Sequence, residues 1–116
     1  MPSQSRKHRG YKSQKIVANY LVSQGWPYAE STGAGRSGTD ITGTIGIDWE
    51  VKARADFSPG AAIKQLKLRS NGKDLPVAVL RLNGQGEESI TEWVFIMRLE
   101  DGVALLKEAG YADGGA

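Results

Sequence analysis

Cysteine is absent from this chain of 116 residues. Its absence excludes disulfides, thiolate zinc sites, iron–sulfur clusters and cysteine nucleophiles, and it fits a reducing compartment. Histidine occurs once, as His8 in a polar N-terminal segment, which makes it a poor candidate for catalysis or metal binding. Long hydrophobic runs are also missing, so we expect neither a membrane span nor a secretory signal. We expect a single soluble domain over residues 1–116, in the cytoplasm of a prokaryotic cell or of a virus-infected host cell.

Acidic residues are missing ahead of Glu30, and this makes the charge uneven along the chain. Residues 1–73 hold twelve Lys and Arg against five Asp and Glu, a net charge of +7. Residues 74–116 hold three against eight, a net charge of −5. A basic half favours a polyanionic partner such as nucleic acid, and a solvated basic surface is the alternative. The side chains that we expect to contact DNA are Arg6, Lys7, Arg9, Lys12, Lys15, Arg36, Lys64 and Lys67.

The spacing of apolar residues predicts an α/β fold. The expected helices cover residues 13–25, 58–72 and 101–109, and the expected strands cover residues 26–31, 39–41, 47–53, 76–82 and 91–99. This order predicts a mixed sheet with helices on its faces. Residues 1–10 and 112–116 are expected to be flexible tails. The glycine-rich loop at 32–38 lacks the Gly-Lys-Ser/Thr of a phosphate-binding loop, so it is either a mobile loop beside a site or a plain linker.

Residues 45–54 alternate strictly between apolar and charged or small side chains, as in a half-buried strand. The apolar positions form one face and should pack into a core, with Trp49 among them. The opposite face carries four ionisable groups in a row: Asp48, Glu50, Lys52 and Arg54. The alternative is a solvent-facing strand whose charges only keep the surface hydrated.

Residues 44–46 fit a three-residue hairpin loop with glycine in the left-handed conformation. Such a loop pairs Asp40 with Glu50, whose Cβ atoms then lie roughly 5 Å apart on one face. Two carboxylates this close repel each other unless a hard cation such as Mg²⁺ or Mn²⁺ neutralises them. Lys52 on the same face would stabilise charge on a phosphoryl transition state or orient the attacking water.

Asp40 followed by the tripeptide Glu50 to Lys52 resembles the PD-(D/E)xK signature of the restriction-endonuclease-like nuclease superfamily. Thr39 stands at the position of the motif's proline. The likeness covers residues 10–82. It implies a core of helix, three strands, helix and strand with a mixed sheet, and leaves a C-terminal strand and helix as an extension.

The resemblance also implies roles for individual residues. Asp40, Glu50 and the carbonyl of Val51 would bind the metal, and Lys52 would assist the attacking water. Gln65, in the helix after the motif, would support the site; an exposed polar helix residue is the alternative.

Within the superfamily the nearest likeness is to the archaeal-type Holliday-junction resolvases. It rests on a basic segment ahead of the first helix, a Gly25-Trp26 pair at the end of that helix and a Ser/Gly-rich loop at residues 31–38. Two positions depart from those enzymes. Gln14 stands where they have a metal-binding glutamate, and Ala34 stands near the position of their loop serine.

This likeness implies a single nuclease domain that cleaves four-way DNA junctions with Mg²⁺ or Mn²⁺. Symmetric cleavage of a junction needs two active sites, so a two-fold homodimer is expected. Two alternatives stay open: a PD-(D/E)xK nuclease acting on linear, forked or flapped DNA, and a non-catalytic nucleic-acid-binding module with the same fold.

Overall fold

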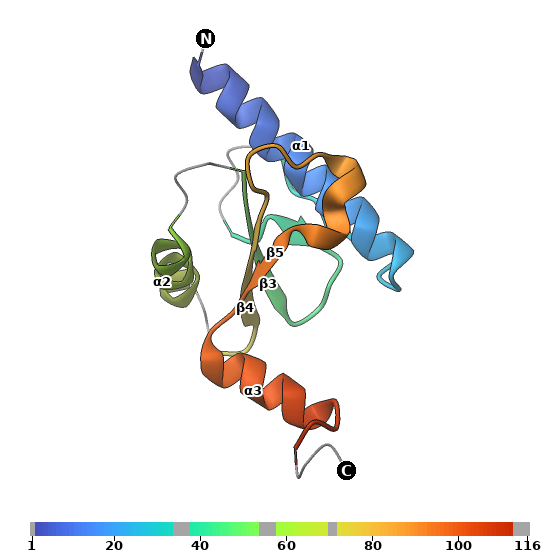
Figure 1. The fold of residues 1–116 in the computed structure, drawn as a ribbon, viewed down its shortest axis with the longest axis vertical. Helices are drawn as coiled ribbons and strands as arrows, with labels where there is room; N and C mark the ends of the chain where they lie inside the picture. The colour runs from blue at the N-terminus through green and yellow to red at the C-terminus, as the bar shows by residue number, and fades with distance from the viewer. Residues whose placement is uncertain (1, 34–37, 54–57, 70–71, 113–116) are drawn as a thin grey trace.

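The computed structural model of the chain describes residues 2–33, 38–53, 58–69 and 72–112, with the backbone alone for residues 2–9 and 69. Its elements follow in the order α1 (Pro2–Ser23), β1 (Glu30–Ser31), β2 (Ile41–Thr42), β3 (Ile47–Lys52), α2 (Pro59–Arg69), β4 (Leu75–Leu80), η1 (Glu87–Glu92), β5 (Val94–Ile96) and α3 (Leu99–Glu108) (Figure 1). Apart from the 3-10 helix η1, this is the predicted order, and the α/β class is confirmed.

The described strands form a three-stranded mixed sheet and a separate two-stranded ribbon. In the sheet, β4 lies between β3, which it pairs in parallel, and β5, which it pairs antiparallel. The register places Glu50 beside Ala78 and Val51 beside Val79. The ribbon pairs β1 with β2. Because β4 is central and covered on both faces, its residues from Pro76 to Leu80 are all buried.

Helices cover the two faces of the sheet. On one face, Trp49 and Val51 pack into the main core with a buried stripe of α1 that includes Val17 and Leu21. On the opposite face, Ala62 and Leu66 of α2 pack on Ala78. Because side chains alternate along β3, Glu50 and Lys52 lie on the α2 face, the same face as Ala78. Figure 1 shows α1 and α2 on opposite sides of the sheet.

The helix ends differ from the prediction at the N-terminus. α1 begins at Pro2 rather than near Ser13, so its backbone includes most of the segment expected as a flexible tail. Proline is tolerated in the first helical turn, and the Gln, Arg and Lys residues that follow are good helix formers. At the other end of the chain, residues 113–116 lie outside the described residues.

The strand ends differ as well. The expected strand at 26–31 is reduced to Glu30–Ser31, because the Trp26 N–H donates to the Leu21 carbonyl and closes the helix end instead. The expected strand at 91–99 is shortened to Val94–Ile96 by η1.

α3 extends away from the sheet at the lower end of the view in Figure 1. None of its residues is buried, although Leu99, Val103 and Leu106 lie along one side of the helix at helical spacing. The hydrogen bond from Arg98 to Asp101 joins the residue before α3 to its first turn and raises the pKa of Arg98. None of the described helices is both long enough and apolar enough to cross a membrane.

Candidate functional site

The charged face of β3 is buried. Glu50 is only 5% exposed, and Asp48 is also buried. Lys52 Nζ lies 2.8 Å from Glu50 Oε1, with 25% of the lysine side chain exposed. The alternative of a strand with hydrated surface charges is therefore wrong for Asp48 and Glu50. Arg54, the fourth charge of this face, lies outside the described residues. Burial of a carboxylate is costly unless it is paired, so this sheet face is an unusual place for charge in an otherwise apolar core.

Asp40 reaches the same strand from the segment ahead of β2. Its Oδ2 accepts a hydrogen bond of 2.7 Å from the Val51 N–H. Its own N–H donates to the Trp49 carbonyl at 2.9 Å. Asp40 is thus hydrogen-bonded to Trp49 and Val51, the two residues that flank Glu50 in the chain.

The predicted direct pairing of Asp40 with Glu50 is wrong in its register, because the backbone bond joins Asp40 to Trp49. The reason is Thr39, whose Oγ1 accepts the Trp49 N–H at 2.8 Å. Side-chain oxygens of Thr39 and Asp40 thus replace backbone carbonyls as partners of β3. A turn does form at the predicted place, since the Ile47 N–H donates to the Thr44 carbonyl and Gly46 has a φ of +90°. The predicted hairpin pairing is not found among the described strands, because β2 pairs with β1.

The carbonyl of Val51 lies at the edge of β3 that faces Asp40. Leu75 and Arg81 donate from the β4 side to the carbonyls of Gly46 and Lys52, at 2.7 and 2.8 Å. Backbone groups of alternate residues point to opposite edges of a strand, so the even-numbered residues of β3 bond to β4. The peptide groups of the odd-numbered residues, Val51 included, point to the other edge. The backbone therefore aligns the Val51 carbonyl with the Asp40 carboxylate.

Gln14 approaches from the other face of the sheet. It lies on the buried stripe of α1, is 8% exposed, and its Oε1 has no hydrogen-bond partner among the described residues. A buried oxygen without a donor is rare in a folded protein and signals a ligand, water or ion. Because α1 packs on the face of Trp49 and Glu50 points to the other face, Gln14 and Glu50 are not brought together by a direct contact.

The remaining expected site residues are on the surface. Gln65, Lys64 and Lys67 of α2 are exposed, and the Gln65 side chain has no hydrogen bond to another described residue. Lys12 and Lys15 of α1 are exposed too, with Lys15 Nζ 5.8 Å from the centre of the Tyr11 ring. For three other residues expected to contact DNA, Arg6, Lys7 and Arg9, the structure describes the helical backbone alone, and Arg36 lies outside the described residues.

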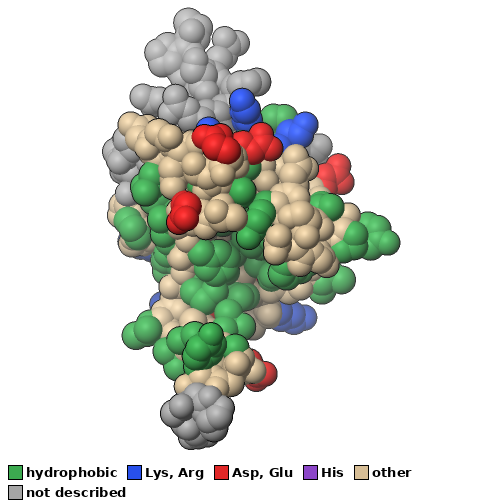
Figure 2. All heavy atoms as spheres, turned by 45° about the vertical axis from the view of Figure 1, so that its right-hand side comes forward, with side chains coloured by type: hydrophobic (Ala, Val, Ile, Leu, Met, Phe, Trp, Pro, Cys, Tyr) green, Lys and Arg blue, Asp and Glu red, His purple; other side chains and the backbone are tan. Residues whose placement is uncertain are grey.

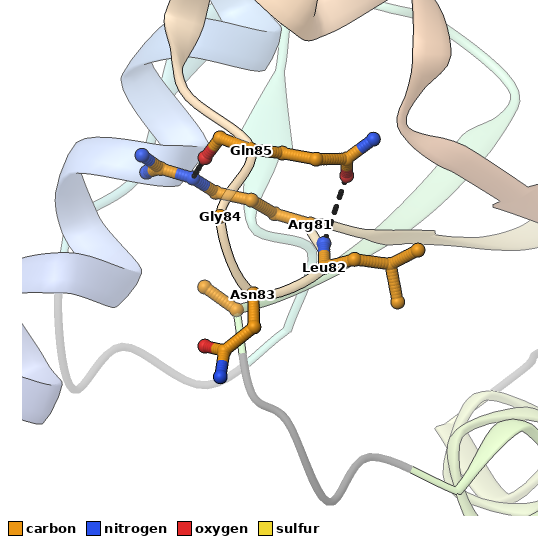
Figure 3. A pocket seen from close by; sticks show the side chains of 6 residues that line it. Arg81, Leu82, Asn83, Gly84 and Gln85 are labelled. Atoms are coloured by element: carbon orange, nitrogen blue, oxygen red, sulfur yellow. Dashed lines mark hydrogen bonds between the residues drawn. The ribbon is translucent and has the colours of Figure 1, made fainter.

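Sequence reasoning missed Arg81, which directly follows β4. Its Nε donates to the Gln85 carbonyl at 2.7 Å, as Figure 3 shows. Its Nη1 donates to Ser13 Oγ at 3.1 Å, and its guanidinium lies 5.2 Å from the Trp93 ring centre. The only available signal was an arginine at the carboxyl end of an apolar strand, where ligand sites of α/β sheets form.

The donor set is suitable for a hard cation. Carboxylates of Asp40 and Glu50 and the Val51 carbonyl are oxygen donors, the kind that Mg²⁺ and Mn²⁺ take. Gln14 Oε1 is an oxygen donor too, but it lies on the other face of the sheet from Glu50. No cluster of three or more Asp, Glu or His side chains arranged for a metal occurs within the described ranges. Mg²⁺ often takes only one or two carboxylates and completes its shell with waters and substrate phosphate, so two carboxylates are sufficient.

Comparisons of the chain with protein-family models, with curated proteins and with solved structures gave no match.

Proposed function

We propose that this protein is a metal-dependent endonuclease with a restriction-endonuclease-like core that hydrolyses DNA phosphodiester bonds. One observation carries the proposal: the buried Glu50 pairs with the partly exposed Lys52 on β3, and the edge of β3 away from β4 holds the Asp40 carboxylate against the Val51 N–H. Buried carboxylates are costly in an apolar core, which favours a functional reason for their presence here. The proposal rests on this geometry together with the PD-(D/E)xK resemblance.

Each residue has a role in this account. Asp40, Glu50 and the Val51 carbonyl would hold Mg²⁺ or Mn²⁺, which when bound supplies Lewis-acid stabilisation of phosphoryl charge. Lys52, partly exposed beside Glu50, positions the attacking water and stabilises the charge that grows on the phosphate oxygens. Gln14 stands where the resemblance has a metal-binding glutamate, but it approaches from the other face of the sheet, so we assign it no role at the metal.

The substrate that we propose is a four-way DNA junction or another branched DNA. Basic side chains occur on both helices that flank the sheet, Lys12 and Lys15 on α1 and Lys64 and Lys67 on α2. Positive charge on two helices that lie on opposite sides of the sheet gives two separate places where a duplex arm can contact the protein, which suits a branched substrate.

A second copy of the chain is the partner that we propose for α3. The exposed apolar residues in this region are Val94, Phe95, Leu99, Val103, Leu105, Leu106 and Tyr111, and Figure 2 shows hydrophobic side chains gathered over the lower part of the molecule. Leu99 is 82% exposed and Leu106 is 53% exposed, so this side of α3 is open to a partner. A ten-residue helix is marginal alone in water, so it needs a covering surface.

Self-association is also compatible with the charges of α3, of which Glu100 already pairs with Arg98 at 3.2 Å. If two copies of α3 pack antiparallel about a two-fold axis, Leu99 of each copy meets Leu106 of the other. The same arrangement brings the exposed Glu100 near Lys107 of the second copy, so opposite charges face each other at both ends. A homodimer provides the two active sites that symmetric cleavage requires.

A DNA-binding module without catalysis is the second candidate. It is favoured by the 2.8 Å ion pair, because a carboxylate bound to Lys52 satisfies both charges without a metal. Nucleases of the same superfamily that act on linear, forked or flapped DNA remain the alternative for substrate.

The test is a cleavage assay on end-labelled four-way junction, replication fork, flap and linear duplex, each with Mg²⁺, Mn²⁺, Ca²⁺ or EDTA. We expect cleavage with Mg²⁺ or Mn²⁺ and none with EDTA, and the junction should be cut fastest. Equal rates on all substrates would reject the junction specificity. Binding without cleavage in every metal would favour the binding module.

A further inference from the structure

A cavity of about 270 Å³ opens at the carboxyl ends of the parallel strands β3 and β4. It is lined by Ala53, Arg81, Leu82, Asn83, Gly84 and Gln85. None of these six side chains is acidic. The cavity adjoins the candidate site, because the Arg81 N–H donates to the carbonyl of Lys52 at 2.8 Å.

The loop that forms the cavity is closed by Gln85. The Leu82 N–H donates to Gln85 Oε1 at 2.9 Å, as drawn in Figure 3, and the Gln85 N–H donates to the Leu82 carbonyl at 3.1 Å. Gln85 Nε2 in turn donates to the Glu92 carbonyl. The loop is therefore fixed, while the backbone N–H groups of Asn83 and Gly84 have no partner among the residues that the structure describes.

Arg81 is fixed as firmly as the loop. Ser13 of α1, the Gln85 carbonyl and the Trp93 ring hold its guanidinium from three segments of the chain. These contacts use two of its five N–H donors, and in the described part of the chain the other three have no acceptor. An arginine already held in place loses little conformational entropy when it binds an anion.

We propose that this cavity binds a phosphate group of the DNA strand next to the phosphate that is cleaved. Arg81, the two N–H groups of the loop and the exposed Asn83 amide place hydrogen-bond donors around the cavity, which is the chemistry that recognises a phosphate. That the bound phosphate belongs to a polynucleotide rests on the proposed function. The donors around the cavity support binding of an anion independently of the proposed nuclease activity.

Asn83 is the residue to change, because Arg81 also bridges α1 to the sheet and its removal would unsettle the fold. Asn83→Asp and Asn83→Lys place opposite charges at the cavity without removing a hydrogen bond that the structure shows. Gln24→Asp and Gln24→Lys, at an exposed position after α1, are the matched controls. Binding of a labelled four-way junction is measured by fluorescence anisotropy in Ca²⁺, so that binding is read without cleavage.

We expect Asn83→Asp to weaken binding and Asn83→Lys to strengthen it, each about threefold or more at low salt, with the Gln24 variants near wild type. The log–log salt slope should steepen by about 0.9 for Asn83→Lys, as one more phosphate is neutralised. Equal binding by both Asn83 variants and wild type would overturn the proposal.

A second readout separates this proposal from the proposed function. In a ¹H–¹⁵N spectrum, titration with inorganic phosphate should shift the amide signals of Asn83 and Gly84 but not that of Gln24. If the amides shift and the wild-type protein binds no DNA, the site takes free phosphate and the polynucleotide occupant is rejected. If Asn83→Lys binds the junction more tightly than wild type and Asn83→Asp more weakly, but no metal supports cleavage, the proposed nuclease activity is rejected and the proposed phosphate site is retained.

Discussion

Lys52 tests the chemistry of the site at the scale of one residue. Lys52→Ala removes the only ammonium bound to Glu50 in the described part of the chain. We expect the single-turnover cleavage rate to fall by about 100-fold or more, because charge stabilisation at the phosphate is removed, with junction binding in Ca²⁺ changed far less. Lys64→Ala, at an exposed position of α2, is the control for removal of one positive charge. Equal decreases in binding and rate would make Lys52 a simple phosphate ligand.

Gly43 tests how the segment around Asp40 is held. It has a φ of +83°, and a Cβ at this position would overlap the carbonyl oxygen of Tyr28. Gly46 has a similar φ of +90° but open space around it. We expect Gly43→Ala to lower the free energy of unfolding by about 3 kcal/mol and Gly46→Ala by about 1 kcal/mol, since only the first adds a clash to the left-handed strain. Urea denaturation measures both free energies of unfolding. Equal decreases would show that the backbone near Tyr28 moves to make room for the added methyl group at little cost.

At this scale, the burial of single residues was easier to predict than their contacts. The alternation of residues 45–54 correctly predicted the core position of Trp49. It failed for Ile45, which is fully exposed because the chain is still turning there. The register between Asp40 and β3 was not predictable, because it depends on the Thr39 hydroxyl acting as an acceptor in place of a backbone carbonyl. Arg81 was missed because its partners come from Ser13, Gln85 and Trp93, which are spread along the sequence.

At the scale of elements, α3 gives the test of self-association. Leu106→Glu places a charge in the proposed two-fold contact and should shift the protein from dimer to monomer, because a buried carboxylate there has no partner. Sedimentation velocity at several protein concentrations measures the change. Leu68→Glu is the control, since Leu68 is an exposed leucine on α2, away from this contact. A wild-type protein that is monomeric at all concentrations would reject the contact, as would a dimer that survives Leu106→Glu.

Helices and central strands were predicted well because their signals are local and periodic. α2 begins where the Ser58-Pro59 pair predicted, and Ser58 Oγ accepts the Ala61 N–H as a helix cap does. The ribbon of β1 and β2 was poorly predicted, since two-residue strands have no measurable period. The pairing of β2 with β1 rather than with β3 arises from long-range contacts that no local pattern contains.

At the scale of the whole molecule, the uneven charge should govern DNA affinity. Replacing Arg6, Lys7 and Arg9 by Gln keeps good helix formers in α1 and removes three positive charges. We expect the log–log salt slope of junction binding to flatten by about 0.9 for each phosphate that these side chains no longer neutralise. Lys107→Gln, on α3, is the control. A slope that does not change would show that this end of α1 does not contact DNA.

The most direct test of the account is metal-dependent cleavage of a labelled four-way junction by Asp40→Asn and Glu50→Gln, compared with Asp48→Asn. Asp48 is a buried carboxylate on the same face of β3 and serves as the matched control. Asp40→Asn retains an oxygen that can accept the Val51 N–H, so the fold should survive, and thermal unfolding checks this for every variant. We predict that with Mg²⁺ the wild type and Asp48→Asn cut the junction, whereas Asp40→Asn and Glu50→Gln bind it in Ca²⁺ but do not cut. Cleavage by either of these two variants at near the wild-type rate would contradict the account.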